Sequence, residues 1–260
     1  MTFQPLDVET MSNIQPVPVD WLWPQRIARG KLSVLAGDPG LGKSFLTTDI
    51  AARVSRGETT WPDGSPGSNP GRVLLLSAED DPADTIRPRL DAAGADCDRI
   101  RIVRTAFDKD GYPTAFNLRD HQSGLRAELS REEGYDLLVI DPIASHVGNI
   151  DSHVNAQVRT VLTPLQQLAA ERGVAVVAVH HLNKGGNLGV SAISRLSGSG
   201  AFGAAARSVM LVAKDPNDES RRIVACVKSN VGREWPGLAF TIAGEPTKVE
   251  WDGPPVLITP

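Results

Sequence analysis

The chain has 260 residues, of which 41% are hydrophobic and 22% are charged, a composition ordinary for a soluble globular protein with one substantial core. Its formal net charge is −4 and its pI is near 5.8, which excludes a general basic field of the kind that attracts nucleic acid. Any contact with nucleic acid must therefore be local.

The cysteines and the first residues indicate a compartment. Cys97 and Cys226 lie far apart and match no metal or redox spacing, which favours a reducing cytoplasm. Residues 1–14 lack a basic start and an apolar core, and no apolar run approaches the length of a membrane span. We expect a cytoplasmic protein that does not contact a membrane.

Two segments differ in character at the start of the chain. Residues 1–18 are polar and punctuated by proline, which predicts a flexible N-terminal arm. Residues 19–260 are expected to form one domain, and residues 221–260 should be a small antiparallel β extension at its C-terminal end. Residues 221–228 and 238–243 are its predicted strands.

A glycine-rich turn follows an apolar run at residues 32–36 and leads into a predicted helix at 45–54. This order of strand, turn and helix is the context that a phosphate-binding loop requires, because its backbone N–H groups and the helix dipole meet at one point. Lys43 would neutralise the β and γ phosphates of ATP, and Ser44 would ligate Mg²⁺. The residues expected to bind the nucleotide are Gly37, Asp38, Pro39, Gly40, Leu41, Gly42, Lys43, Ser44 and Phe45.

Buried strands and helices alternate after this loop. Apolar runs at 72–77, 100–103, 135–140, 174–179 and 208–213 predict strands, and helices are predicted at about 82–93, 121–131, 154–172 and 201–206. Residues 107–118 are expected to form an irregular loop, and residues 183–200, with five glycines, a mobile one. The pattern predicts an α/β fold with a mostly parallel central sheet flanked by helices, and a ligand at the carboxyl ends of the strands.

Polar side chains stand where the predicted strands end. Asp141 follows four apolar residues, which is the pattern of the residue that holds Mg²⁺ opposite a phosphate loop. In many such ATPases the next residue is the carboxylate that orients the attacking water, but here it is Pro142. Glu79 is therefore the first candidate for that carboxylate and Asp80 the second, although both could instead cap the following helix. His180, more than His181, is expected to face the nucleotide and sense its γ-phosphate.

Four motifs together resemble the RecA-like ATPases of the RepA type, the ring-forming helicases of plasmids and phages and their AAA_25 relatives. The segments are 37–44, 77–81 (Ser-Ala-Glu-Asp-Asp), 137–142 (Leu-Leu-Val-Ile-Asp-Pro) and 179–184 (Val-His-His-Leu-Asn-Lys). The resemblance covers roughly residues 15–235. It implies a homo-oligomer, a hexamer in the family, with ATP between subunits and single-stranded DNA in the central channel, and a primase or an initiator protein as a further partner.

The resemblance also assigns residues that act on the neighbouring subunit. Arg207 matches the place of the family's arginine finger, and Lys228 matches the lysine of a late Lys-Asn-Arg-Phe-Gly motif, whose arginine is displaced here to Arg233. Such an arginine contributes on the order of 10³ to 10⁵ in rate. The family's DNA-binding loops correspond to residues 146–153 and 183–200, and the second of these contains Lys184 and Arg195.

These observations predict an ATP-hydrolysing DNA motor, most closely a ring-shaped replicative DNA helicase of a plasmid or phage type. The expected catalytic residues are Glu79, Lys43, Asp141, His180, Arg207 and Lys228, and the expected metal ligands are Ser44 and Asp141. Two alternatives stay open. One is a RadA-like recombination ATPase that binds DNA without unwinding it, and the other is a nucleotide switch that regulates a protein partner.

Overall fold

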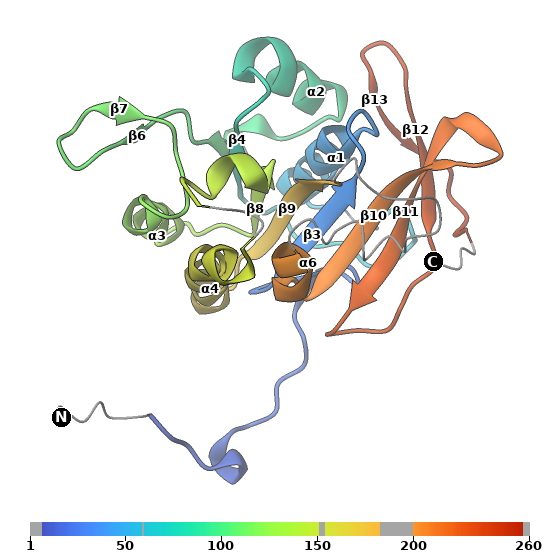
Figure 1. Cartoon of the computed structure of the whole chain (residues 1–260). Helices are drawn as coiled ribbons and strands as arrows, with labels where there is room; N and C mark the ends of the chain where they lie inside the picture. Colours follow the sequence, from blue (N-terminus) through green and yellow to red (C-terminus); the bar gives the residue numbers. More distant parts are fainter. Residues whose placement is uncertain (1–6, 59, 151–153, 183–199, 257–260) are drawn as a thin grey trace, which may run out of the picture.

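A nine-stranded sheet runs through the protein (Figure 1). The computed structural model describes residues 7–58, 60–150, 154–182 and 200–256. The strand order is β13-β12-β11-β10-β3-β9-β8-β4-β5, in which β10 to β5 are parallel neighbours and β11 to β13 are antiparallel. The strands are β3 Leu32–Gly37, β4 Val73–Ser77, β5 Ile100–Ile102, β8 Leu137–Asp141, β9 Ala175–His181, β10 Ser208–Asp215, β11 Asp218–Ser229, β12 Leu238–Ala243 and β13 Lys248–Trp251. The predicted fold class is confirmed.

Helices cover both faces of this sheet because its central strands are apolar on both sides. The helices α1 and α2 lie on one face and α3, α4 and α6 on the other (Figure 1). The α-helices are α1 Lys43–Arg56, α2 Arg87–Ala92, α3 Gln122–Leu129, α4 Asn155–Arg172 and α6 Gly200–Ala205; short helical turns are η1 Met11–Asn13, η2 Pro82–Ile86, η3 Cys97–Arg99 and η4 Ile143–His146.

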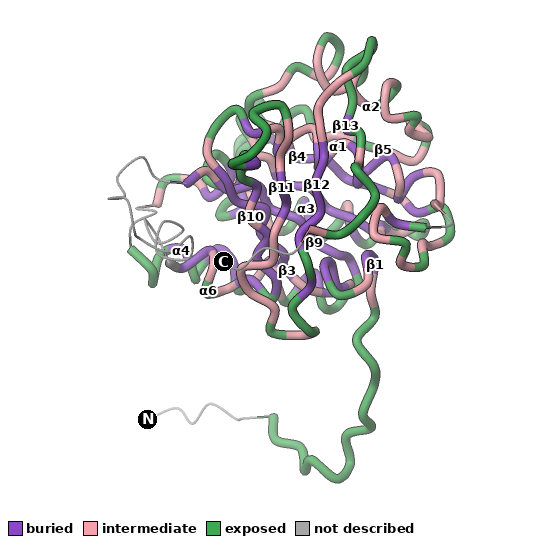
Figure 2. Tube along the Cα trace, turned by 90° about the vertical axis from the view of Figure 1, so that its right-hand side faces the viewer, coloured by how far each residue is buried: buried purple, intermediate pink, exposed green. Residues whose placement is uncertain are grey.

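Two hydrophobic clusters, one on each face, hold the layers together, and the buried trace in Figure 2 follows the sheet between them. Strand β9 contributes to both, because successive side chains of a strand point to opposite faces. Its Val176 and Ala178 pack against α4 and α6, whereas Val177 and Val179 pack against α1. The carboxyl ends of β3, β9, β8 and β4 therefore meet at one edge, where the phosphate loop, Glu79, Asp141 and His180 lie.

The structure differs from the sequence prediction in two short segments. The loop expected to be irregular at 107–118 contains a small hairpin, β6 Ala106–Phe107 and β7 Pro113–Thr114, closed by a turn in which Asp108 accepts the amides of Asp110 and Tyr112 at 2.9 Å. The C-terminal extension has a third strand, β13, whose Trp251 Nε1 donates to Asp49 of α1 at 3.0 Å. The extension is thus tied to the helix that follows the phosphate loop.

The N-terminal arm leaves the body of the protein at β1 Trp21–Trp23, which pairs with β2 Ile27–Ala28 (Figure 1). Residues 7–20 are all exposed, and only η1 interrupts their extended course. The division of the chain at residue 18 stays a prediction. Among the described helices, none is both long and apolar enough to cross a lipid bilayer.

Candidate nucleotide-binding site

The phosphate-binding loop connects the end of β3 to the first residue of α1. Gly40 and Gly42 have φ values of 78° and 83°, in the left-handed region that favours glycine. Gly42 is the N-cap of α1 and makes no side-chain cap, so the N–H groups of the first turn remain available to an anion. This is the local geometry that the sequence motif predicts.

Lys43 is placed to meet a phosphate. Its side chain is buried, and Nζ donates to the backbone oxygens of Gly37 at 3.0 Å and Asp38 at 2.8 Å. Burial lowers the pKa of Lys43, and the charges of Asp141, Asp38 and Glu79 oppose this shift. The ammonium group therefore lies inside the loop, where phosphate oxygens would compete with the two carbonyl groups for its hydrogen bonds.

Two neighbouring strands press on the back of the loop. A Cβ atom at Gly37 would lie 2.7 Å from the carbonyl oxygen of Val212 in β10, and a Cβ atom at Gly42 would overlap the Cδ1 atom of Ile242 in β12. The loop thus lies between the parallel sheet and the C-terminal extension. The backbone contact restricts position 37 to glycine, and at position 42 the φ of 83° does so.

Asp141 is the last residue of β8, beside the loop, and its carboxylate accepts a hydrogen bond from the side chain of Ser44. The pKa of Asp141 is raised to about 6, chiefly by burial and also by the negative charges of Asp80 and Glu79, while the hydrogen bond from Ser44 and the charge of Lys43 oppose the shift. A hollow of about 30 Å³ borders Ser44, Asp80 and Asp141. A cation there would relieve the repulsion among the carboxylates.

The donor set fits Mg²⁺. Ser44 and Asp141 offer the hydroxyl and carboxylate oxygens that this ion prefers, and Mg²⁺ in nucleotide sites takes its other ligands from phosphates and water. No group of three His, Cys, Asp or Glu side chains suited to a metal occurs in the described ranges.

Glu79 differs from the two acidic residues that follow it. Asp80 forms an ion pair with Arg89 at 2.7 Å, and Asp81 caps the next helical turn by accepting the amides of Ala83 and Asp84. Glu79 is left with a side chain that is 60% exposed and forms no hydrogen bond within the part of the chain that is described. Of the three, it is the carboxylate free to orient a water molecule.

The two histidines of β9 point to opposite faces of the sheet. The ring of His180 is buried against Phe202 of α6, with 4.8 Å between ring centroids, and burial lowers its pKa to about 4. His181 Nε2 lies 3.9 Å from Glu79 Oε2. The histidine beside the candidate water-orienting carboxylate is therefore His181, whereas burial and the charge of Lys43 lower the pKa of both rings, and the prediction that His180 senses the nucleotide stays a prediction.

Arg207 lies at the other end of the sheet. Its amide donates to the carbonyl oxygen of Leu32 at 2.8 Å, at the start of β3, whereas the phosphate loop begins at Gly37. Five residues of parallel strand span about 17 Å. The exposed Arg207 is therefore remote from the phosphate loop of its own chain.

Lys228 is hydrogen-bonded to neighbouring backbone groups. Its Nζ donates to the carbonyl oxygens of Gly203 at 2.9 Å, Ala204 at 3.1 Å and Ala206 at 2.8 Å, which uses all three N–H donors of the ammonium group. The structure thus places Lys228 as a cap of α6, directly before Arg207, and not as a free cation. Arg233 is exposed, and its amide donates to Gln25.

The two predicted DNA-binding loops are only partly described. His146 is buried, and its Nδ1 lies 3.3 Å from the carbonyl oxygen of Phe116, which ties the start of the first loop to the core. Residues 151–153 and 183–199, with Lys184 and Arg195, lie outside the described residues.

Sequence reasoning missed one group beside the loop. The guanidinium carbon of Arg89 lies 4.4 Å from the ring centroid of Phe45, and Arg89 also borders the hollow between Ser44 and Asp141. No sequence signal marks this arginine, because its spacing from Glu79, along the helix that follows, matches no recognisable motif.

A family model described as "AAA domain" matches residues 1–187, which include the loop, Glu79 and Asp141. The chain belongs to the AAA_25 family. With the geometry above, this membership supports a nucleotide-binding ATPase domain.

Several curated proteins are similar to part of the chain. The DNA repair protein RadA of Streptococcus pneumoniae is 28% identical over 166 residues, which cover 62% of this chain and 32% of the relative. RadA of Streptococcus pyogenes is 27% identical over 166 residues, and RadA of Brucella abortus is 28% identical over 161, each covering 62% of this chain and 30% of the relative. The chain thus spans about a third of the length of the relatives it matches.

Proposed function

We propose that the protein is an ATP-hydrolysing DNA motor that works as a ring of identical subunits. In the helicase family that the chain resembles, this ring is a hexamer. One observation carries the proposal. The site holds a phosphate loop, a metal-side aspartate and a free carboxylate, while the candidate arginine finger lies about 17 Å away along the sheet. Arg207 can meet a γ-phosphate only on another subunit.

Each residue then has a role in phosphoryl transfer. Lys43 and the loop amides would bind the phosphates of ATP, and Ser44 and Asp141 would hold Mg²⁺, whose positive charge would offset that of the phosphates. Glu79 orients the attacking water. His181 Nε2 lies 3.9 Å from Glu79 Oε2, which is near enough for the histidine to respond to the charge of Glu79. Arg207 of the adjacent subunit stabilises the transition state.

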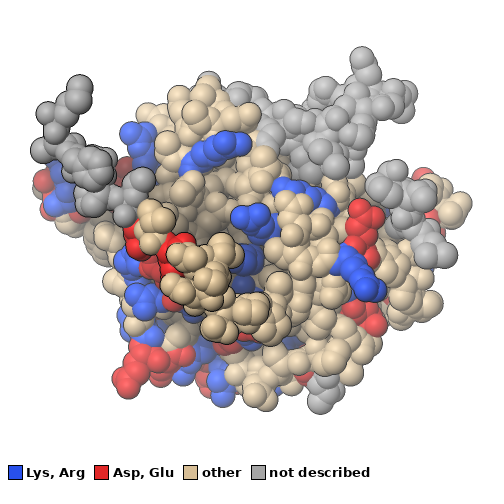
Figure 3. All heavy atoms as spheres, turned by 90° about the horizontal axis from the view of Figure 1, so that it is seen from below, with Lys and Arg blue, Asp and Glu red and all other residues tan. Residues whose placement is uncertain are grey.

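The DNA contact is proposed to be local. Basic and acidic side chains of the described residues are interspersed on the face shown in Figure 3 and form no continuous basic surface there. Loops at 146–153 and 183–200 would contact the backbone of a single strand, and repetition around a ring would multiply a few weak contacts. The similarity to RadA, which is named a DNA repair protein, supports DNA as the substrate.

Two activities fit such a motor. A replicative helicase would separate strands and cooperate with a primase or an initiator protein. A RadA-like recombination ATPase would bind DNA without separating strands, and the similarity of this chain to RadA proteins from three species supports this second activity. A nucleotide switch that controls a protein partner would need no DNA.

The test is ATP hydrolysis by the full chain with and without single-stranded DNA, measured over a range of salt concentrations. We expect stimulation by the strand that weakens steeply with salt, because phosphate contacts release counterions. Displacement of a labelled strand from a forked duplex then separates the helicase from the recombination ATPase. Hydrolysis that does not respond to DNA at any salt concentration would leave the nucleotide switch.

A further inference from the structure

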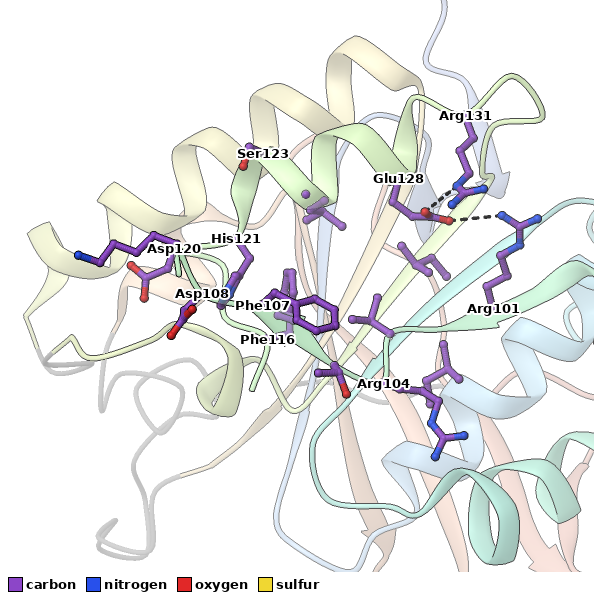
Figure 4. Close-up of a pocket in the computed structure, with 18 residues that line it drawn as sticks. Arg101, Arg104, Phe107, Asp108, Phe116, Asp120, His121, Ser123, Glu128 and Arg131 are labelled. Atoms are coloured by element: carbon purple, nitrogen blue, oxygen red, sulfur yellow. Dashed lines mark hydrogen bonds and ion pairs between the residues drawn. The ribbon is translucent and has the colours of Figure 1, made fainter. Parts of the chain in front are cut away.

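Two groups of polar side chains lie away from the phosphate loop. One lines a cavity of about 1130 Å³ formed by β5, the β6–β7 hairpin and α3, where Arg101 and Arg131 both pair with Glu128 (Figure 4). The other group converges on the last turn of α6, directly before Arg207. The second group bears on the proposed reaction, because Arg207 is the candidate arginine finger.

The backbone of Arg207 is held between two strands. Its N–H group donates to the carbonyl oxygen of Leu32, the first residue of β3, at 2.8 Å. Its carbonyl oxygen accepts from the amide of Asn230, which directly follows β11, also at 2.8 Å. The side chain of Arg207 is exposed, so its reach toward another subunit depends on where this backbone lies.

Side chains also hold the four residues that precede Arg207. The last carbonyl oxygens of a helix have no partner within it. Here Lys228 Nζ donates to those of residues 203, 204 and 206, and Gln166 Nε2 donates to that of Ala205 at 2.7 Å. All four carbonyl groups between the middle of α6 and Arg207 are therefore hydrogen-bonded to a side chain of a different element.

The two supporting side chains and α6 itself belong to the packed body of the protein. Gln166 is half-buried on α4, and Lys228 lies opposite Val209 in the pairing of β10 with β11. Phe202, in the middle of α6, is 1% exposed and packs against the ring of His180 at 4.8 Å between centroids. The last turn of α6 is thus tied to one helix and two strands.

A fixed position matters for an arginine that acts across an interface. The guanidinium must meet charge that develops on the transferred phosphoryl group. A misplacement of about 1 Å can cost on the order of 10² in rate. Nothing in the donating chain contacts the reacting atoms apart from the arginine itself, so the backbone under Arg207 sets its alignment.

We propose that Lys228 and Gln166 are positioning residues, which hold the end of α6 so that Arg207 is aligned with the nucleotide of the adjacent subunit. This role rests on the proposed function, since it needs a site shared by two subunits. It differs from the role that the resemblance implies for Lys228, a direct action on the neighbouring subunit. The three N–H donors of this lysine are used within its own chain.

The first experiment separates the subunit that supplies the arginine from the one that supplies the phosphate loop. Full chains with Lys43→Ala are donors and full chains with Arg207→Ala are acceptors, so ATP turnover by the mixture comes from the interfaces between them. We expect Gln166→Met in the donor to lower the recovered turnover about 10- to 100-fold without changing the KM for ATP. The same substitution in the acceptor should leave turnover unchanged, because no arginine there depends on it.

The matched control is Gln167→Met in the donor, which alters the next, exposed residue of α4 and should have no effect. Lys228→Met should act like Gln166→Met, and Lys228→Arg should restore turnover. Loss with Lys228→Met alone would show that the lysine itself acts on the neighbour, and equal loss in donor and acceptor would show a general structural effect; either overturns the positioning role. No recovery even with the unsubstituted donor overturns the shared site of the proposed function, and the positioning role with it.

A second measurement needs no nucleotide. Amide hydrogen exchange of the full chain reports how often the hydrogen bonds around Arg207 open. We expect peptides that cover residues 201–210 to exchange about tenfold faster in Gln166→Met than in Gln167→Met, while peptides from α1 exchange alike in both. Equal exchange at residues 201–210 overturns the proposal.

Discussion

His180 allows a quantitative test of the packing behind the site. Its ring is buried against Phe202, and burial lowers its pKa from 6.5 to about 4. The unfolded chain takes up a proton at this residue below pH 6.5, and the folded chain does not until about pH 4. The free energy of unfolding must therefore fall as the pH falls through this window. A difference of 6.5 − 4 = 2.5 pH units corresponds to a limit of about 3.4 kcal/mol.

The perturbation is His180→Gln, which removes the titrating group and keeps a polar side chain of similar length. Urea unfolding at pH 7.5 and at pH 4.5, with a chelator present, gives the change in the free energy of unfolding between the two pH values for each protein. We expect the unaltered protein to lose about 2.5 kcal/mol more than the variant over this interval. Other titrating groups, such as Asp141 with its raised pKa, act in both proteins and cancel in the comparison. A difference below about 1 kcal/mol would refute the reasoning, because the protonated ring would then have a partner or solvent.

Two further predictions concern catalysis, and a third concerns stability. Glu79→Gln should keep ATP binding, measured by a fluorescent analogue, and lose about 10² to 10⁴ in turnover; an active variant would contradict the assignment of this carboxylate. Arg207→Ala should assemble normally and lose on the order of 10³ in turnover, and mixing it with Lys43→Ala should recover activity, since each supplies what the other lacks. Lys228→Met leaves three carbonyl oxygens of α6 without a charged donor and should lower the free energy of unfolding by about 1–3 kcal/mol, whereas Lys228→Arg should retain most of it. Full stability of Lys228→Met would argue against the cap.

The sequence predicted the features that depend on local pattern. Apolar runs of five or six residues gave the parallel strands, and the polar residues at their ends gave Glu79 and Asp141, because a parallel sheet collects its carboxyl ends at one edge. The phosphate loop was also predictable from local sequence, because Gly40 and Gly42 are required by the positive φ values of their own positions.

Features that depend on contacts far apart in the chain were not predictable. In β9 both faces are buried, so the alternation of Val177, Ala178 and Val179 carries no polarity signal to show which histidine faces Glu79. The two-residue strands β6 and β7 are too short for any periodicity. The cap by Lys228 joins residues more than 20 positions apart, and its lysine looks in sequence like the family's trans-acting one.

The contact between Gly42 and Ile242 has a consequence for how this protein can be divided. The family match ends at residue 187, yet the side chain that fills the space behind the phosphate loop comes from β12, and Trp251 of β13 holds α1 from the same direction. A fragment cut at the boundary of the match would carry the complete motif without its support. In chimeras, affinity for ATP should therefore follow the origin of residues 238–251 as well as that of the motif itself. Substitutions at Ile242 offer a way to change this affinity without altering a proposed catalytic residue.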